Sequence, residues 1–289
     1  MFTANDVKNL REMTGVGMLD CKKALTESNG DMDKAVEYLR ENGLAKAAKK
    51  SGRIAAEGLT AVKSSNNKVV MIEINSETDF VSKNDEFKEL VDIILNTILE
   101  SNVTTLEDAL KLTTSTGSTI EEVIVEKTVK IGEKLSFRRL AVMDASGSIG
   151  TYIHMGGKIS SYVVIEGVSE EVSKDVAMHI AALNPRYLNK NEIPEEVIAK
   201  EREILTEQAK NEGLDEAKLP MIVEGRIGKF CKEICLEDQM FIKADKQTVS
   251  AYVKANGGVI KAWARYEVGE GIEKKEENFA EEVMKQIEG

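Results

Sequence analysis

Residues 75–87, NSETDFVSKNDEF, hold the side chains of this sequence that are best suited to specific recognition. In the middle of this segment the carboxylate of Asp79 stands directly beside the aromatic ring of Phe80. A rigid apolar tip next to an acid suits a wedge that pushes into another protein. It suits catalysis poorly, because a phenylalanine ring has neither an acidic proton nor a lone pair to offer.

Two regular elements are expected to position this tip. The apolar run at residues 69–74 predicts a buried strand. Apolar residues then recur at helical spacing and predict a helix over residues 85–100: Phe87, Leu90, Val91, Ile94, Leu95 and Ile98. A short loop between two packed elements can hold its tip rigidly.

A second interpretation of the loop stays open on the sequence alone. Ser82 is a possible cap for the following helix, with Asp85 three residues further on. An aromatic residue just before such a cap often folds back onto its own helix. In that case Phe80 stabilises the helix and is not an exposed tip.

The composition is that of a globular protein, with 42% apolar and 31% charged residues among 289. No apolar run approaches the roughly 20 residues that a membrane-spanning helix needs. The first residues show neither the basic nor the apolar segment of a signal peptide, so we expect a cytoplasmic protein that binds no membrane. The net charge of −11 argues against a broad nucleic-acid-binding face, which requires a cationic surface.

Metal and cofactor chemistry has little support in the sequence. The three cysteines are Cys21, Cys231 and Cys235, and neither His154 nor His179 is near the last two. Two thiols alone do not complete a zinc site, so we expect free thiols in the core and no metal. The sequence contains no phosphate-binding loop, dinucleotide fingerprint or nucleophile elbow. We therefore expect neither a cofactor nor an enzyme active site.

The first 54 residues are expected to form a small helical domain and its linker. Asn5 and Asp31 can cap the first and third of three short helices, which can end at Gly15, Gly30 and Gly43. The basic cluster at residues 46–53 is typical of a solvated linker helix, and a nucleic-acid contact is the alternative.

The body of the chain contains a weak internal repeat. VVMIE at 69–73 resembles YVVIE at 162–166, and GEKLSFRRLAV at 132–142 resembles GVIKAWARYEV at 258–268. Each half holds two strand-like segments, a helix and a third strand-like segment; the helix is expected at residues 85–100 in the first half and at roughly 170–183 in the second. The gap between the first two strands is too short for a parallel crossover, so both halves are expected to form antiparallel sheets.

An insertion separates the helix and the last strand of the second half, and it holds all three prolines of the chain. Pro194 suits the first turn of a helix to about residue 211, and a second helix is expected over residues 216–236. Two helices joined by a short turn form an antiparallel hairpin. Such a hairpin either projects and meets a partner, for example its own copy, or packs back on the core.

The predicted fold class is α+β. It combines a small three-helix N-terminal domain, a core of two related three-stranded antiparallel α+β subdomains, and an inserted helical hairpin. The expected divisions are residues 1–54 for the helical domain and linker, 55–145 for the first core subdomain, 146–185 with 237–268 for the second, 186–236 for the hairpin, and 269–289 for a C-terminal helical module.

Four segments resemble the bacterial elongation factor Ts family, in the right order along the whole chain. They are TGVGMLDCKKAL at 14–25, TDFV at 78–81, MIVEGR at 221–226 and RYEVGEGIEK at 265–274. The family is the guanine-nucleotide exchange factor for elongation factor Tu, the GTPase that delivers aminoacyl-tRNA to the ribosome. The resemblance implies a ubiquitin-associated (UBA)-like N-terminal domain and a coiled-coil arm, and it implies no catalytic site or cofactor in this chain.

The resemblance also implies which residues contact the GTPase. The motif that would intrude beside the partner's magnesium site and promote GDP release is Thr78, Asp79, Phe80 and Val81. Positions that contact the partner's GTPase domain match Lys8, Arg11, Met18 and Leu19, and a contact with a more distant partner domain matches His154.

Three further expectations concern partners. The arm helps some family members to dimerise, so a homodimer through residues 186–236 is expected to be accessible to this chain. The helix after Gly271 approaches the partner in the family. A nucleic-acid-binding translation accessory protein, which would use the N-terminal domain and the basic cluster, is the alternative function; the net charge makes direct nucleic-acid binding the less expected outcome.

Overall fold

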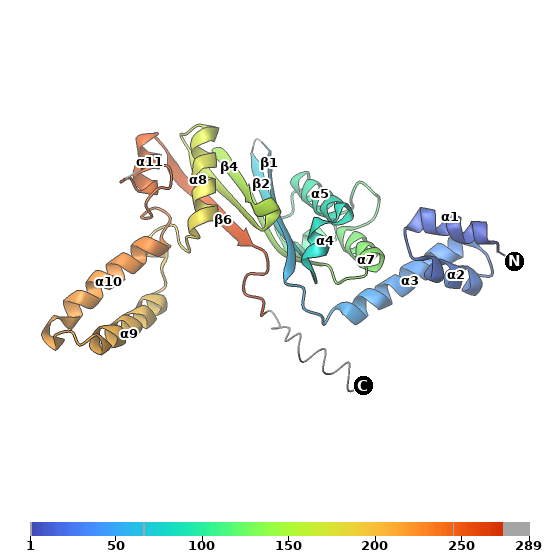
Figure 1. Cartoon of the computed structure of the whole chain (residues 1–289). Coiled ribbons are helices and arrows are strands. Elements are labelled where there is room, and N and C mark those ends of the chain that lie inside the picture. Colours follow the sequence, from blue (N-terminus) through green and yellow to red (C-terminus); the bar gives the residue numbers. More distant parts are fainter. Residues whose placement is uncertain (1, 66, 245, 274–289) are drawn as a thin grey trace.

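A computed structural model describes residues 2–65, 67–244 and 246–273 of the chain. The N-terminal region contains three helices: α1 (Ala4–Thr14), α2 (Met18–Glu27) and α3 (Met32–Lys50) (Figure 1). All three contribute to one small core, in which Leu10, Cys21 and Leu25 are fully buried. Asp31 caps α3, as predicted, by accepting a hydrogen bond from the N–H of Lys34.

Two of the predicted helix ends in this region were wrong. Thr3, not Asn5, caps α1, because a capping box forms there and its hydroxyl accepts a backbone N–H of the first turn. The third helix does not end at Gly43. It continues through most of the basic cluster to Lys50, and Gly43 is buried inside it, where α3 packs closely on Val129 of α7 (Ile120–Ile131).

The first sheet has the order β1-β2-β3 and is antiparallel, as predicted. Its strands are β1 (Glu57–Ser65), β2 (Lys68–Ser76) and β3 (Ser136–Asp144). Four helices join β2 to β3: α4 (Asp79–Lys83), α5 (Asp85–Leu99), α6 (Leu106–Leu110) and α7. The apolar periodicity predicted α5, whereas α6 and α7 were not predicted.

The second sheet has the order β4-β5-β6 and is also antiparallel. Its strands are β4 (Ser148–His154), β5 (Ile159–Glu166) and β6 (Val259–Glu267), with a 3-10 turn, η1 (Met155–Gly157), between the first two. The predicted helix is α8 (Glu170–Leu183), and a further helix, α11 (Val249–Ala255), precedes β6. The two halves of the internal repeat therefore share one strand order.

The two sheets pack face to face, and each carries helices on its outer side (Figure 1). Along β2, residues 70, 72 and 74 face a core shared with α5 and α7. Val69 and Met71 point the other way and pack against Tyr162 and Val164 of β5. The layers are thus helix, sheet, sheet and helix. A strand buried on both faces needs apolar side chains on both, which explains the apolar run at residues 69–72 of β2.

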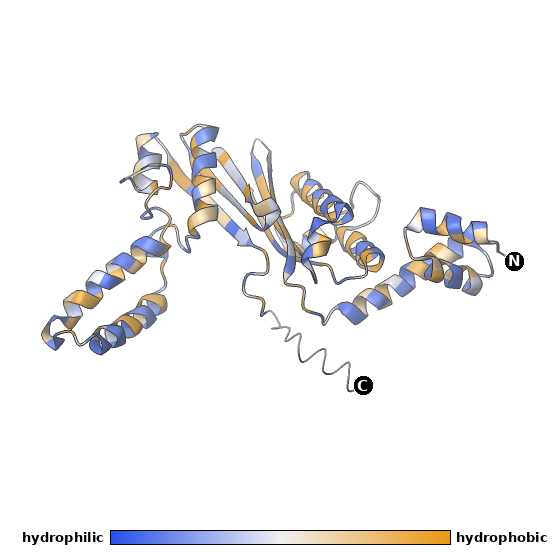
Figure 2. Cartoon of the chain, in the orientation of Figure 1, coloured by the Kyte–Doolittle hydropathy of each residue, from blue (hydrophilic) through white to orange (hydrophobic). Residues whose placement is uncertain are grey.

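The insertion forms a helical hairpin that projects from the sheets and does not pack back on them (Figure 1). It contains η2 (Lys190–Glu192), α9 (Glu195–Asn211), η3 (Glu216–Lys218) and α10 (Leu219–Ile234). The apolar residues of the two helices gather along their shared seam and include Val223, Ile227 and Cys231 (Figure 2). Backbone hydrogen bonds from the N–H groups of Arg186 (2.8 Å) and Tyr187 (3.2 Å) to the carbonyl of Ile234 close its base.

Within the described part of the chain, no helix combines the length and the apolar character needed to cross a bilayer. After β6 the described chain runs to Glu273. The predicted C-terminal helical module, including the helix expected after Gly271, therefore lies almost entirely outside the described residues.

Candidate functional site

The candidate loop joins β2 to α5 and contains the short helix α4. Thr78 takes the N-cap position of α4, but its side chain does not cap that helix. Its hydroxyl donates instead to one carboxylate oxygen of Glu133 (2.7 Å), and its N–H donates to the other (2.9 Å). The hydroxyl of Ser76 donates to the Thr78 carbonyl (2.9 Å). The first residues of the loop are therefore fixed by polar contacts on both sides.

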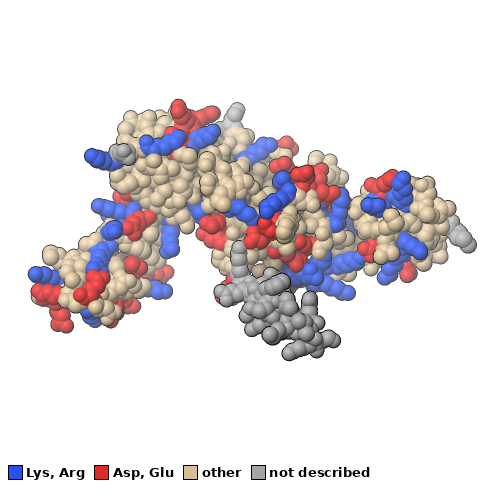
Figure 3. All heavy atoms as spheres, viewed as in Figure 1, with Lys and Arg blue, Asp and Glu red and all other residues tan. Residues whose placement is uncertain are grey.

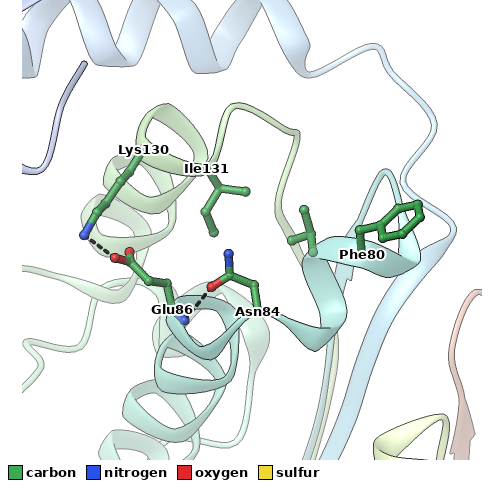
Figure 4. A pocket seen from close by; sticks show the side chains of 6 residues that line it. Phe80, Asn84, Glu86, Lys130 and Ile131 are labelled. Atoms are coloured by element: carbon green, nitrogen blue, oxygen red, sulfur yellow. Dashed lines mark hydrogen bonds and ion pairs between the residues drawn. The ribbon is translucent and has the colours of Figure 1, made fainter. Parts of the chain in front are cut away.

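Phe80 and Val81, although adjacent, have opposite environments. Phe80 is 78% exposed, whereas Val81 is 8% exposed and packs into the core beneath the first sheet. Neighbouring residues of a helix point about 100° apart, which lets one side chain anchor α4 while the next faces solvent. In Figure 4 the ring of Phe80 is turned away from Asn84 and Ile131. The loop thus presents an exposed aromatic side chain on an anchored turn.

The alternative in which Ser82 caps the following helix is wrong. Ser82 lies inside α4 and donates its hydroxyl to the Asp79 carbonyl (2.7 Å). The residue that caps α5 is Asn84, whose side-chain oxygen accepts the N–H of Glu86 (2.8 Å). The chain forms an extra turn of helix before the cap. As a result the ring of Phe80 does not fold back onto α5.

Asp79 is ionised and partly compensated within the loop. Lys83, four residues on, donates to its carboxylate (2.7 Å). This hydrogen bond is the main cause that lowers the pKa of Asp79, and the charges of Lys83 and Lys158 act in the same direction. The Lys83 ammonium also lies 5.8 Å from the centroid of the Phe80 ring. The tip therefore combines an apolar ring with a paired carboxylate and ammonium.

An open hollow adjoins the loop, and its lining side chains are drawn in Figure 4. Besides Phe80 and Val81, its lining residues are Asn84, Glu86, Lys130 and Ile131. Lys130 of α7 forms an ion pair with Glu86 of α5, and the hydrogen bond from Lys130 is the main cause that lowers the pKa of Glu86. Helix α7, which was not predicted from the sequence, thus supplies one wall beside the loop.

The four candidate residues of the N-terminal helices are all exposed. Lys8 and Arg11 lie on α1, and Lys8 faces Glu12 at 3.7 Å. Met18 and Leu19 open α2 and are 54% and 84% exposed. Two adjacent exposed apolar side chains on so small a core form a second surface with recognition character.

His154 lies apart from the loop residues in the fold. It is the last residue of β4 in the second sheet and is exposed. Its ring stacks on Tyr152 with centroids 6.0 Å apart, and its Nδ1 is 3.4 Å from the Tyr152 hydroxyl. The sequence-predicted residues therefore occupy three surfaces, on the loop, on the N-terminal helices and on the second sheet.

The basic cluster at residues 46–53 is largely engaged within the chain. Lys46 pairs with Asp20 (2.8 Å), Lys50 donates to a carbonyl of the α7–β3 connection, and Arg53 pairs with Glu77 (3.2 Å). On the face shown in Figure 3, acidic and basic side chains lie interspersed over all parts of the molecule. These contacts favour the linker interpretation over a nucleic-acid contact.

The described residues contain no cluster of side chains that could bind a metal ion. No group of three or more His, Cys, Asp or Glu side chains there has suitable geometry, and all three cysteines are free and buried. His179 is buried and hydrogen-bonded to Gln239 (3.0 Å). Its environment is that of a core residue.

Two sets of residues at the site were missed by the sequence analysis. The carboxylate of Glu133 holds the start of the loop, and Glu77 accepts the backbone N–H of Lys134 (2.5 Å). The fully buried Glu73 accepts hydrogen bonds from Arg138 and Arg139 on β3. Each partner is more than 50 residues away in sequence, so no local pattern marks these pairs.

One comparison with known proteins bears on these surfaces. The family model described as "Elongation factor TS" matches residues 77–270. The match covers more than half of the chain, including the loop motif at 78–81, β3, the whole second sheet and the hairpin, while the N-terminal helices, β1 and β2 lie outside it. Its span shows that the chain belongs to the elongation factor Ts family.

Proposed function

We propose that this chain promotes GDP release from elongation factor Tu by inserting the loop Thr78–Val81 beside the magnesium site of the GTPase. Family membership implies nucleotide exchange on elongation factor Tu in translation elongation, and an exchange factor rather than an enzyme. The loop mechanism goes beyond that. The observation that carries it is the 78% exposure of Phe80 on a turn whose neighbour, Val81, is anchored in the core.

The energetic argument begins with the ring. Burying a phenylalanine side chain fully gains roughly 1.5–3 kcal/mol. Since 78% of Phe80 is available, insertion into a hydrophobic slot of the partner gains about 1.2–2.3 kcal/mol. That gain can offset displacement of the elements that position the magnesium ion. Without the ion the phosphate charge of GDP is poorly compensated, and nucleotide affinity falls.

Linkage sets a limit on what the factor does. If the bound factor weakens the binding of GDP to the GTPase, bound GDP weakens the binding of the factor by the same ratio. The factor therefore accelerates release without selecting the nucleotide that follows. The excess of GTP over GDP selects it.

The other surfaces extend the same proposal. The exposed Lys8, Arg11, Met18 and Leu19 contact the GTPase domain, and His154 contacts a more distant domain of the partner. The N-terminal helices act as a UBA-like docking domain over residues 1–54. The core divides into 55–145 and 146–185 with 237–268, and residues 269–289 form a C-terminal module. The arm, residues 186–236, acts as a coiled coil through which two copies can associate. The proposed setting is the cytoplasm.

The direct test measures release of fluorescent GDP from elongation factor Tu over a range of factor concentrations. Phe80→Ala should lower the rate of release at subsaturating factor by roughly 8- to 50-fold, the factor that corresponds to the insertion energy. Because little of the ring is buried in the free chain, Phe80→Ala should cost less than about 1 kcal/mol of unfolding free energy. Met240→Ala removes another exposed apolar side chain, outside the proposed surfaces, and serves as the matched control.

Two outcomes would contradict the proposal. One is release by Phe80→Ala at the rate of Met240→Ala. The other is a marked loss of thermal stability in Phe80→Ala with exchange intact, which is the behaviour of a structural staple. Salt-dependent RNA binding by the isolated chain would support the alternative, a nucleic-acid-binding accessory protein.

A further inference from the structure

The loop and the connection between α7 and β3 hold each other through two carboxylates. Glu133 accepts both donors of Thr78, at 2.7 and 2.9 Å. Glu77, the residue before Thr78, accepts the backbone N–H of Lys134 at 2.5 Å. Each segment thus contributes one carboxylate to the backbone of the other. We call residues 77, 78, 133 and 134 the carboxylate clamp.

The carboxylate clamp also reaches the linker after α3. The ammonium of Lys134 donates to the carbonyls of Ser51 (2.6 Å) and Arg53 (2.8 Å). Arg53 in turn donates to both oxygens of Glu77, at 3.2 and 3.3 Å. Three segments of the chain therefore meet directly behind the loop tip, which lies only two residues beyond Thr78.

Thr78 is the point at which this network determines the direction of α4. Its backbone is extended at the N-cap, and its hydroxyl, which would ordinarily cap the helix, is committed to Glu133. A five-residue helix such as α4 has too few internal hydrogen bonds to hold its own orientation. Its direction depends on Thr78 at one end and on Val81 in the core.

From these contacts we infer that Glu133 is a positioning residue for the exchange reaction: its carboxylate holds Thr78 so that Phe80 is presented in the conformation that enters the partner. The inference rests on the proposed role of the loop. Glu133 itself lies behind the tip. It acts by setting the fraction of free molecules whose loop already has the conformation that enters the partner. When that fraction falls, the apparent affinity falls in proportion.

The test compares Glu133→Ala, Glu133→Gln and a matched control, Glu126→Ala, which removes an exposed carboxylate from the middle of α7. In the GDP-release assay Glu133→Ala should raise the factor concentration for half-maximal rate about tenfold and leave the maximal rate unchanged. Glu133→Gln should restore most of the affinity. Its amide oxygen accepts the Thr78 N–H, and its NH₂ group donates to the hydroxyl.

A second measurement needs no partner. Amide hydrogen exchange of the segment that includes Thr78 should speed up in Glu133→Ala and stay slow in Glu133→Gln and Glu126→Ala. Unchanged protection of these amides in Glu133→Ala would overturn the inference, even if the variant releases GDP from the partner more slowly.

A double-mutant cycle with Phe80→Ala separates positioning from general stability. If Glu133 acts through the ring, Glu133→Ala should change the half-maximal concentration by less than about twofold in the F80A background. The same tenfold effect in both backgrounds would overturn the inference, as would a half-maximal concentration equal to that of Glu126→Ala. A fully active F80A variant would instead refute the proposed function of the loop, whatever Glu133→Ala does.

Discussion

Glu73 offers the sharpest test of how the core holds the strand that leads to the loop. It lies in the middle of β2 and is fully buried, yet it is charged. Its carboxylate accepts hydrogen bonds from Arg138 (3.1 Å to each oxygen), Arg139 (2.5 Å), the amide of Asn75 (3.0 Å) and the N–H of Gly269 (2.8 Å). One side chain therefore joins β2, β3 and the segment after β6.

A β-bulge explains why two arginines reach the same carboxylate. The register of β2 with β3 shifts between Glu73 and Ile74, where Glu73 pairs with Arg139 and Ile74 with Phe137. The extra residue, Arg138, turns toward the same face as its neighbour. Arg139 then extends to the carbonyl of Glu267 (2.8 Å) and lies 4.2 Å from the ring centroid of Tyr266. The cluster thus bridges the two sheets.

The expected cost of Glu73→Ala follows from this geometry. Removing one partner of a buried ion pair costs about 3–5 kcal/mol, because the other charge stays buried without compensation. The two arginines are 26% and 24% exposed, so water compensates part of the loss and we expect the lower end, about 3 kcal/mol. Glu73→Gln keeps the volume and some acceptors and should cost about 2 kcal/mol.

Urea unfolding monitored by tryptophan fluorescence is the suitable assay. Trp263, the single tryptophan, lies on β6 in the second sheet and therefore reports on the part of the core that the cluster ties to β2. Glu107→Ala is the control, because that carboxylate is on the surface and pairs with Lys111 four residues on. An unfolding free energy of Glu73→Ala within about 0.5 kcal/mol of that control would refute the reasoning.

Three further predictions concern other parts of the molecule. Val81→Ala should have the opposite phenotype to Phe80→Ala, losing about 1–2 kcal/mol of unfolding free energy because it opens a cavity under the sheet. A thermal stability equal to that of wild type would contradict the role of Val81 as the anchor of the loop. Burial lowers the pKa of His179 from 6.5, so the folded state resists its protonation. The contribution of the neutral imidazole to the unfolding free energy is fully present above about pH 6.5. It is lost as the pH falls through the lowered pKa of the folded state, with a slope of up to about 1.4 kcal/mol per pH unit. His179→Gln should therefore show a flatter decline of urea stability between about pH 7.5 and about pH 5.5, and a decline as steep as that of wild type would argue against a buried neutral imidazole. Replacement of residues 190–233 by a short glycine linker should leave the core folded, because Leu236 and Glu237 still pair with Tyr187 and Leu188 at the base of the arm. If the arm mediates self-association, any dimer that the full chain forms should be absent from the shortened chain in sedimentation. A dimer that persists would place the contact outside the arm.

Most of the regular elements could be predicted from the sequence. The strand at 69–74 and the helices at 85–100 and 170–183 carry strong local periodicity, and they form where expected. The hairpin was marked by its three prolines. The short helix α4 was not predicted, because the motif at 78–83 has too few residues for a periodic signal. The helix α7, residues 120–131, was not predicted either.

The sequence by itself determined that residues 78–81 lie between a buried strand and a helix, because hydrophobic period and length are local properties of the chain. Only the tertiary structure decided that Phe80 faces solvent while Val81 faces the core. That outcome depends on Glu133 holding Thr78 from 55 residues away and on the first sheet covering Val81. The ionic cluster at Glu73 likewise joins residues 196 positions apart. Contacts across such separations depend on how the elements pack. That packing depends on all segments of the chain together and is not encoded in any one of them.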